Sequence, residues 1–392
     1  MLRWGLTIFR YGLCAVAVAL LIWGVNWRHD QVTLSDAKHT KVRLVSYDEE
    51  NGLFTVVVDG REQTLAADRI LHEDGLPEIH YSVVSTVRRM DWRTACIAVV
   101  LFAPVPFLSG VRLVWMLQIQ QVRLPLWKAV TLTFAGNFFN FALPGTTGGD
   151  LLKAVYVTRF TQRKTEAVTT IFLDRVIGLL GLTFVATATF VFAWSRIEWE
   201  PTFRHSIGVF LATVWGGLFV GVIFVFSKRL RNLIRLPQLA KVMPAGDQLL
   251  RIGRATVAMR SHKLLITLSF AATIGLQLLV VISAYVMARA LRMSGSAELY
   301  FVCVPLGFVI SAIPIAPPQG AGVMEGAYVL FFARGGLNPA SAAVTFALAT
   351  RFIQLVWALP GVLVPLLGAH LPSKRELAEL ERGADDAPGA VA

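Results

Sequence analysis

Charged residues are scarce in this sequence. Asp, Glu, Lys and Arg make up 16% of the chain, against about a quarter in soluble domains, whereas hydrophobic residues make up 55%. A soluble protein of this composition would expose apolar patches that drive aggregation, but a lipid bilayer removes that penalty because it is itself an apolar solvent. The composition therefore argues against an ordinary soluble enzyme and predicts an integral membrane protein with several spans.

Cysteine is rare, and recognisable catalytic motifs are missing. Cys14, Cys96 and Cys303 lie in apolar runs without partners at metal-ligand spacing, so we interpret them as small buried hydrophobic residues. The seven histidines are scattered, and the sequence contains no Ser/His/Asp arrangement, HExxH motif, P-loop or nucleotide fingerprint. We therefore expect a protein that is not an enzyme and that uses no metal or cofactor.

Acidic residues are also too few to balance the basic ones, and the net charge is +12. Residues 28–93 hold 9 basic and 12 acidic residues, which leaves 28 of the 37 basic and 13 of the 25 acidic residues for the rest of the chain. The basic excess thus accompanies the apolar segments, as it does in the cytoplasmic loops of membrane proteins. Because no basic groove interleaved with aromatic residues appears, we expect no nucleic-acid partner.

Long apolar runs are abundant. A run that ends at residue 27 follows Arg3 and Arg10 and has no small-residue cleavage site, so residues 1–27 are predicted to be an uncleaved transmembrane anchor. The linker 228–263 carries nine Lys/Arg and one acid, which places it in the cytoplasm by the positive-inside rule. We predict a multi-pass protein of the cytoplasmic membrane with both termini in the cytoplasm and a cytoplasmic tail at 369–392. Further spans are expected near residues 94–117, 166–194, 207–226, 264–288 and 340–368.

Residues 28–93 have a different character. Segments 41–47 and 53–58 alternate polar and apolar residues around a Glu-Asn-Gly turn, and a third strand is expected near 63–66. We predict a small β-rich module, net acidic and extracytoplasmic because the first span precedes it. Its expected role is that of a structural cap or of a docking module for an extracytoplasmic protein partner.

Two apolar segments, 126–158 and 299–334, are interrupted by helix-breaking residues. A broken backbone at membrane depth is tolerated only against protein or a water-filled cavity, so each segment is predicted to be a re-entrant pair of half-helices. The charge-based topology makes the first pair enter from the cytoplasm and the second from outside. The second half-helix of each pair is expected to begin just after Gly149 or Gly322. The breaks are Pro144, Gly145, Gly148 and Gly149 in the first segment, and Pro317, Pro318, Gly320 and Gly322 in the second.

The two segments also share a pattern. Each has a glycine, an acid five residues later, and an arginine 25 or 26 residues after the acid: Gly145, Asp150 and Arg175, then Gly320, Glu325 and Arg351. Inverted repeats with broken helices build the central sites of many secondary transporters. We predict an all-α polytopic membrane domain over residues 94–368, with two oppositely oriented re-entrant segments related as an inverted repeat.

Both arginines lie inside apolar spans, where an ionisable residue is costly and usually pairs or lines a cavity. One interpretation is purely structural: Arg175 pairs with Asp174 or Asp150, Arg351 pairs with Glu325, and the pairs hold the bundle together. The other is that the arginines hold an anionic lipid head group while the acids balance charge, since a planar guanidinium can donate two hydrogen bonds to a phosphate.

Neighbouring polar groups allow two readings as well. Backbone N–H groups at the starts of the half-helices would attract an anion, and Asp150 and Glu325 would act there partly as caps. Asn137 and Asn140 either bond a head group or join helices to each other. Lys153 either reaches a phosphate or extends to the membrane interface.

These motifs, taken in order, resemble the lysylphosphatidylglycerol synthase transmembrane-region family, also called the flippase-like family, over about residues 94–368. The resemblance implies a lipid flippase fold, with a polar phospholipid or a polyprenyl-linked glycan as cargo. Full-length synthases of that family carry a cytosolic aminoacyl-transferase domain after the membrane region. This sequence has none, so we expect no aminoacyl-lipid synthesis. The motifs are Asn137…Asn140…Leu143-Pro144-Gly145…Gly148-Gly149-Asp150, Leu173-Asp174-Arg175…Gly178 and Pro314…Pro317…Gly320-Ala321-Gly322…Glu325…Arg351.

The resulting hypothesis is a flippase-like protein that moves a polar or anionic lipid head group, phospholipid or polyprenyl-linked, across the cytoplasmic membrane. Without an ATP-binding motif, transport would be downhill or coupled to an ion. A non-transporting accessory protein of a lipid-linked glycan or envelope pathway is the main alternative, and a lipid-modifying enzyme or a small-solute transporter are others. Membrane lipids are the expected partners, and the sequence leaves homo-oligomerisation open.

Overall fold

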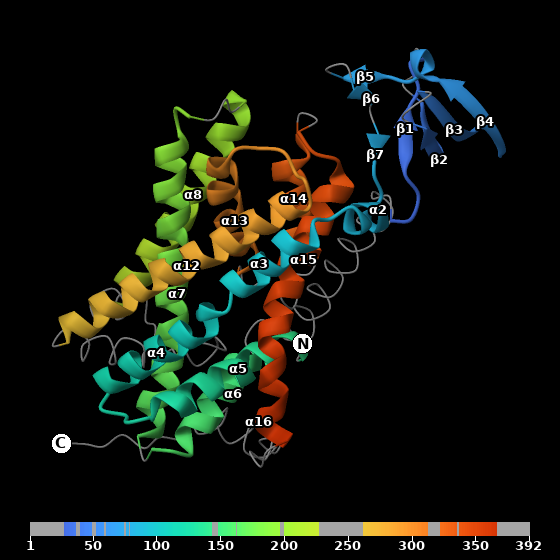
Figure 1. Cartoon of the computed structure of the whole chain (residues 1–392). Coiled ribbons are helices and arrows are strands. Elements are labelled where there is room, and N and C mark those ends of the chain that lie inside the picture. Colours follow the sequence, from blue (N-terminus) through green and yellow to red (C-terminus); the bar gives the residue numbers. More distant parts are fainter. Residues whose placement is uncertain are drawn as a thin grey trace, which may run out of the picture.

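The structure, a computed structural model, combines a bundle of helices with a small β module (Figure 1). The predicted anchor before residue 27, most of the basic linker and the polar tail lie outside the described residues, as do Pro144, Gly145, Pro317, Pro318 and Gly320. The described residues are 27–36, 40–48, 52–58, 60–73, 76–77, 79–142, 148–161, 163–196, 200–226, 262–312, 322–334 and 337–366.

The β module is a five-stranded antiparallel sheet with the strand order β4-β3-β2-β1-β7. The alternation of apolar residues buries Val32, Phe54 and Val56 on one face, where Ile70 packs against them. Gly52, with φ of 62°, provides the left-handed turn residue between β2 and β3. The strands are β1 (Gln31–Thr33), β2 (Lys41–Asp48), β3 (Leu53–Val58), β4 (Arg61–Ala66) and β7 (Ile79–His80); β5 (His72–Glu73) and β6 (Leu76–Pro77) pair separately, and a 3₁₀ turn η1 (Ala67–Arg69) follows β4.

Helices make up the rest of the described chain. Five stretches are long and apolar enough to cross a membrane, and they coincide with the predicted spans: Trp92–Ile119, Glu166–Ala193, Pro201–Gly221, Lys263–Ala290 and Ala340–Val362. The fold is therefore that of a polytopic α-helical membrane protein. The helices are α2 (Val83–Arg88), α3 (Trp92–Leu101), α4 (Pro104–Ile119), α5 (Leu126–Ala142), α6 (Gly148–Thr158), α7 (Lys164–Ala193), α8 (Pro201–Phe226), α12 (Lys263–Ala290), α13 (Ala297–Ser311), α14 (Val323–Phe332), α15 (Ala340–Ala358), the 3₁₀ turn η4 (Leu359–Val362) and α16 (Leu363–Leu366).

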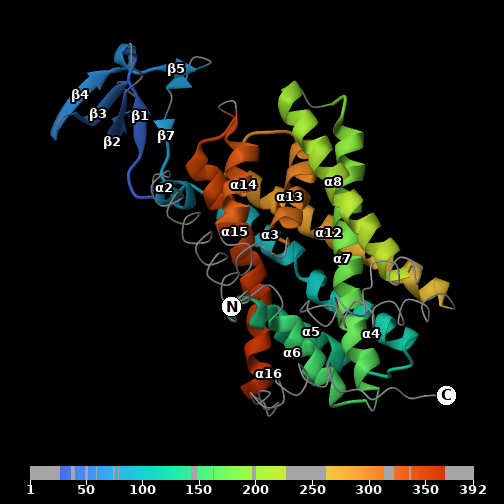
Figure 2. The same cartoon turned by 180° about the vertical axis from the view of Figure 1, so that it is seen from behind.

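The two segments expected to be broken each form two short helices, α5 with α6 and α13 with α14. Helix α6 begins at Gly148, one residue before the glycine predicted to precede it, and α14 begins directly after Gly322 as predicted. The two pairs lie at opposite ends of the helical body, with α13 and α14 at the end that carries the β module (Figures 1 and 2). The predicted topology requires this relative placement, whereas the side of the membrane that each pair faces stays a prediction.

The long helix that follows each pair packs against the first helix of the other pair. Helix α7 follows α6 and packs against α13 of the other pair, where the Thr189 hydroxyl donates to the Phe301 carbonyl over 2.9 Å. Helix α15 follows α14 and packs, together with η4, against α5. Gly361 allows that approach, because a Cβ there would lie 2.2 Å from the Phe134 carbonyl oxygen. Each helix pair is thus held in place by the long helix that follows the other pair.

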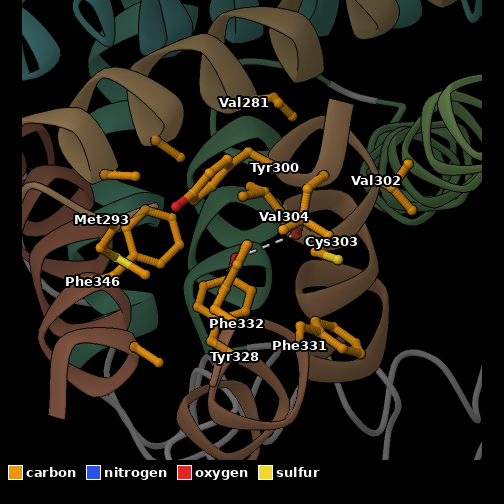
Figure 3. Close-up of a cluster of buried hydrophobic side chains, with 14 of the residues drawn as sticks. Val281, Met293, Tyr300, Val302, Cys303, Val304, Tyr328, Phe331, Phe332 and Phe346 are labelled. Carbon is orange, nitrogen blue, oxygen red and sulfur yellow. Dashed lines mark hydrogen bonds between the residues drawn. The ribbon is translucent and has the colours of Figure 1, made fainter. Parts of the chain in front are cut away.

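An aromatic cluster fixes the second pair (Figure 3). Tyr300 of α13 stacks on Phe332 of α14 with ring centroids 4.7 Å apart, and Phe346 of α15 meets both rings edge-on. The Tyr328 hydroxyl donates to the Val304 carbonyl over 3.3 Å, the bond drawn in Figure 3. Because all four rings are fully buried, they set the position of α14 against α13 and α15.

Candidate functional site

The first charged cluster lies where α6 begins. Asp150, in the first turn of α6, accepts a hydrogen bond from Arg175 of α7 over 2.9 Å, and the Lys153 ammonium lies 3.5 Å from the other carboxylate oxygen. Lys153 is buried, whereas the Arg175 side chain is 38% exposed. Of the two acids that sequence analysis offered to Arg175, the structure therefore pairs it with Asp150.

The start of α6 is held tightly against α5. Asn140 of α5 accepts the Gly149 N–H over 2.9 Å, so it satisfies one of the helix-start donors that have no partner within α6. A Cβ on Gly149 would lie 1.9 Å from the Gly136 carbonyl oxygen, so only glycine permits this contact. Asn140 thus joins helices here, and Asn137 is half-buried one turn earlier on α5.

The second charged cluster lies where α14 begins. Glu325 pairs with Arg351 of α15 over 2.7 Å, and its other oxygen accepts the Gly322 N–H, also over 2.7 Å. Gly322 has φ of 80°, a conformation that favours glycine, so the helix can start abruptly after the break. The Glu325 carboxylate therefore both caps α14 and neutralises Arg351.

A third charged pair was not singled out in the sequence. Asp174 turns away from Arg175 and pairs with Arg112 of α4, whose guanidinium approaches the two carboxylate oxygens over 2.8 and 2.9 Å. A further hydrogen bond, 3.0 Å long, runs from Arg112 to the Thr273 hydroxyl of α12. This pair, in which Arg112 is buried and the Asp174 side chain is 16% exposed, therefore joins α4, α7 and α12. The signal was available, because Arg112 lies inside the predicted span 94–117 just as the other two arginines lie inside theirs.

The sequence of the chain matches a known family over most of its length. The model of the family described as lysylphosphatidylglycerol synthase TM region matches residues 81–361. The chain belongs to this family. Its family match takes in all three charged clusters and both broken segments, whereas the five strands of the sheet lie before it. No curated protein and no solved structure matches the chain.

The three charged clusters of this family member together hold four cations and three carboxylates. Within the described residues, no group of three or more His, Cys, Asp or Glu side chains is arranged to hold a metal ion. Arginine and lysine donors beside helix starts are suited to binding phosphate oxygens, and carboxylates that already pair with them would compete with such a ligand.

Proposed function

We propose that this protein is a lipid flippase that moves a polar or anionic head group across the membrane, as the sequence hypothesis holds. The observation that carries the proposal is the presence of Arg175–Asp150 and Arg351–Glu325 at two helix starts, one in each helix pair. In our proposal the two pairs are re-entrant halves of an inverted repeat, and the head group passes between them. Family membership supports this membrane role.

Moving a lipid head group across the membrane asks little of the protein in physical terms. The acyl chains stay in the bilayer, so the protein has only to lower the barrier for the polar head group. Arginine donors would replace the water that a phosphate loses, and the paired carboxylates would receive the arginines again after release. No chemical bond changes, so the protein would act without being an enzyme.

The test is a head-group translocation assay in liposomes that contain the purified full-length protein and a trace of fluorescent phospholipid. We expect the wild type to accelerate translocation and Arg175→Gln to abolish it. Arg334→Gln is the matched control, because Arg334 pairs with Glu200 away from both helix starts. The proposal fails if Arg175→Gln folds normally and translocates at the wild-type rate.

One observation favours a second function, that of an accessory protein. The sheet lies outside the family match and is anchored to the helical body, so it is an addition to the common membrane domain. If the full-length protein co-purifies with a stoichiometric extracytoplasmic partner and translocates no lipid, the accessory role replaces the flippase role.

A further inference from the structure

The two helix pairs share a helix-start acid paired with an arginine, but they differ in the residue that follows this acid by three positions. In each, the residue three positions after the helix-start acid lies against a glycine of the preceding helix. That residue is Lys153 in the first pair, and a Cβ on Gly136 would lie 2.1 Å from its side chain. In the second pair it is Tyr328, and a Cβ on Gly307 would also lie 2.1 Å from the side chain. The chain therefore places a cation in one pair where it places a neutral aromatic ring in the other.

This difference changes the charge balance of the first cluster. The carboxylate of Asp150 is shared by Arg175 at 2.9 Å and Lys153 at 3.5 Å, so these three side chains sum to one positive charge. The next acid along α7, Asp174, faces Arg112 instead. Electrostatic attraction of an anion is stronger at such a partly enclosed place than in bulk water, because the effective dielectric constant is lower there.

The second cluster pairs one cation with one carboxylate, and this carboxylate is more enclosed than that of Asp150. Glu325 pairs with Arg351, and the second oxygen of Glu325 accepts the Gly322 N–H. The Arg351 side chain is 19% exposed, half the value for Arg175 but more than the 11% of Lys153, and the Glu325 side chain is 6% exposed against 22% for Asp150. Binding an anion there would require breaking a neutral pair that also caps a helix.

We propose that the anionic part of the ligand binds at Arg175 and Lys153, and that Glu325–Arg351 is a neutral structural counterpart. This inference rests on the proposed function and assigns its two arginines different roles. One surplus positive charge matches a phosphodiester, which carries a single negative charge, better than it matches a doubly charged phosphomonoester.

The experiment measures binding alone, by calorimetric titration of the full-length protein in a neutral detergent. The probes are short-chain phosphatidylglycerol, which is a phosphodiester, and inorganic phosphate. We expect Lys153→Met to weaken phosphatidylglycerol binding about tenfold, the size of one charge-assisted hydrogen bond, and Lys153→Arg to restore it. Asp150→Asn should act in the opposite direction and tighten binding, because it removes the competing carboxylate.

The matched variants in the second pair are Tyr328→Phe and Glu325→Gln, which should change binding less than about twofold, since no direct ligand contact is lost. The proposal is overturned if either variant weakens binding as much as Lys153→Met, or if a folded Lys153→Met protein binds like the wild type. Inorganic phosphate that binds as tightly as the lipid, with the same response to Lys153→Met, would assign the site to soluble phosphate. Binding with this pattern but without translocation would keep the site and remove the flippase function.

Discussion

Asp174 and Arg175 are consecutive residues of α7, yet their side chains pair on different sides of the helix, Asp174 with Arg112 and Arg175 with Asp150. Successive residues on an α-helix point about 100° apart, so one rotation of α7 sets both contacts. The Arg112–Asp174 pair therefore fixes the direction in which Arg175 is presented. Gly181 adds to this constraint, because a Cβ there would lie 2.4 Å from the Thr273 side chain of α12.

The first prediction concerns that buried pair. Arg112→Leu leaves the largely enclosed Asp174 carboxylate without this partner and should destabilise the protein by about 3 kcal/mol. The charge-swapped double variant Arg112→Asp/Asp174→Arg should recover part of the loss. Thermal unfolding in detergent measures both. The exposed pair is the control: Arg334→Gln should cost less than about 1 kcal/mol. Similar losses for Arg112→Leu and Arg334→Gln would contradict the assigned burial.

The second prediction concerns the contact between α5 and α6. Gly149→Ala must push these helices apart, because its Cβ would lie 1.9 Å from the Gly136 carbonyl oxygen. We expect a loss of about 2 kcal/mol or more and a fall in translocation. Gly216→Ala on α8 is the control, since nothing lies within 4 Å of its Cβ, and alanine should leave stability equal or higher by up to about 1 kcal/mol. If Gly149→Ala leaves the stability unchanged, the close contact between α5 and α6 at this residue is ruled out.

The third prediction is a pH dependence at the start of α3. The Asp91 carboxylate accepts hydrogen bonds from the Thr94 hydroxyl and the Arg93 N–H, and the bond from Thr94 holds the pKa of Asp91 below its ordinary value. A carboxyl group whose pKa is lowered by folding stabilises the protein above its unfolded pKa, about 3.9, and stops doing so as the pH falls through the folded pKa.

Asp91→Ala should therefore lower the melting temperature near neutral pH and lower it less as the pH falls below the unfolded pKa of about 3.9. Melting curves of wild type and variant over that pH range test this, with Glu62→Ala on the exposed strand β4 as the control. If Asp91→Ala lowers the melting temperature equally at low and at neutral pH, the ionised Asp91 carboxylate is not what stabilises the start of α3.

The fourth prediction is topological. Gln63 on β4 and Arg163 before α7 are both exposed, and the predicted topology places them on opposite sides of the membrane. A membrane-impermeant maleimide applied to intact cells should label Gln63→Cys, whereas Arg163→Cys should react only after the membrane is permeabilised. The reverse pattern would invert the topology, and labelling of both would contradict the separation of these two sites.

The sequence predicted those features that depend on local pattern. The spans, the strands around residues 41–66 and the helix starts near Gly149 and Gly322 follow from hydropathy, alternation and helix-breaking residues, which act over a few residues. Charge pairing was harder, because spacing alone could not decide whether Asp150 or Asp174 faces Arg175. That choice is made by the packing of α4 against α7, which brings Arg112 to Asp174.

The same limit applies to Lys153. Its two predicted roles differ only in which way a flexible side chain turns. The structure turns it toward Asp150, its neighbour one turn earlier on α6, and across Gly136 of α5. The contact with Gly136 joins two helices, so no single-helix pattern contains it. The spacing of glycine, acid and arginine thus predicted the charged residues of the two helix starts, but the unequal charge of the two starts depends on how the helices pack.

The joint between the sheet and the helices is short and bonded on both sides. Asp30 of the β module accepts the N–H of Ser82, the residue that caps α2, and Ser341 of α15 donates to the carbonyl of Tyr81. The sheet is therefore held to the helices by hydrogen bonds at two successive residues, Tyr81 and Ser82. A force that a neighbouring protein applies to the sheet would act through these bonds on the N-terminal end of α15. Arg351 lies on the same helix, ten residues after Ser341.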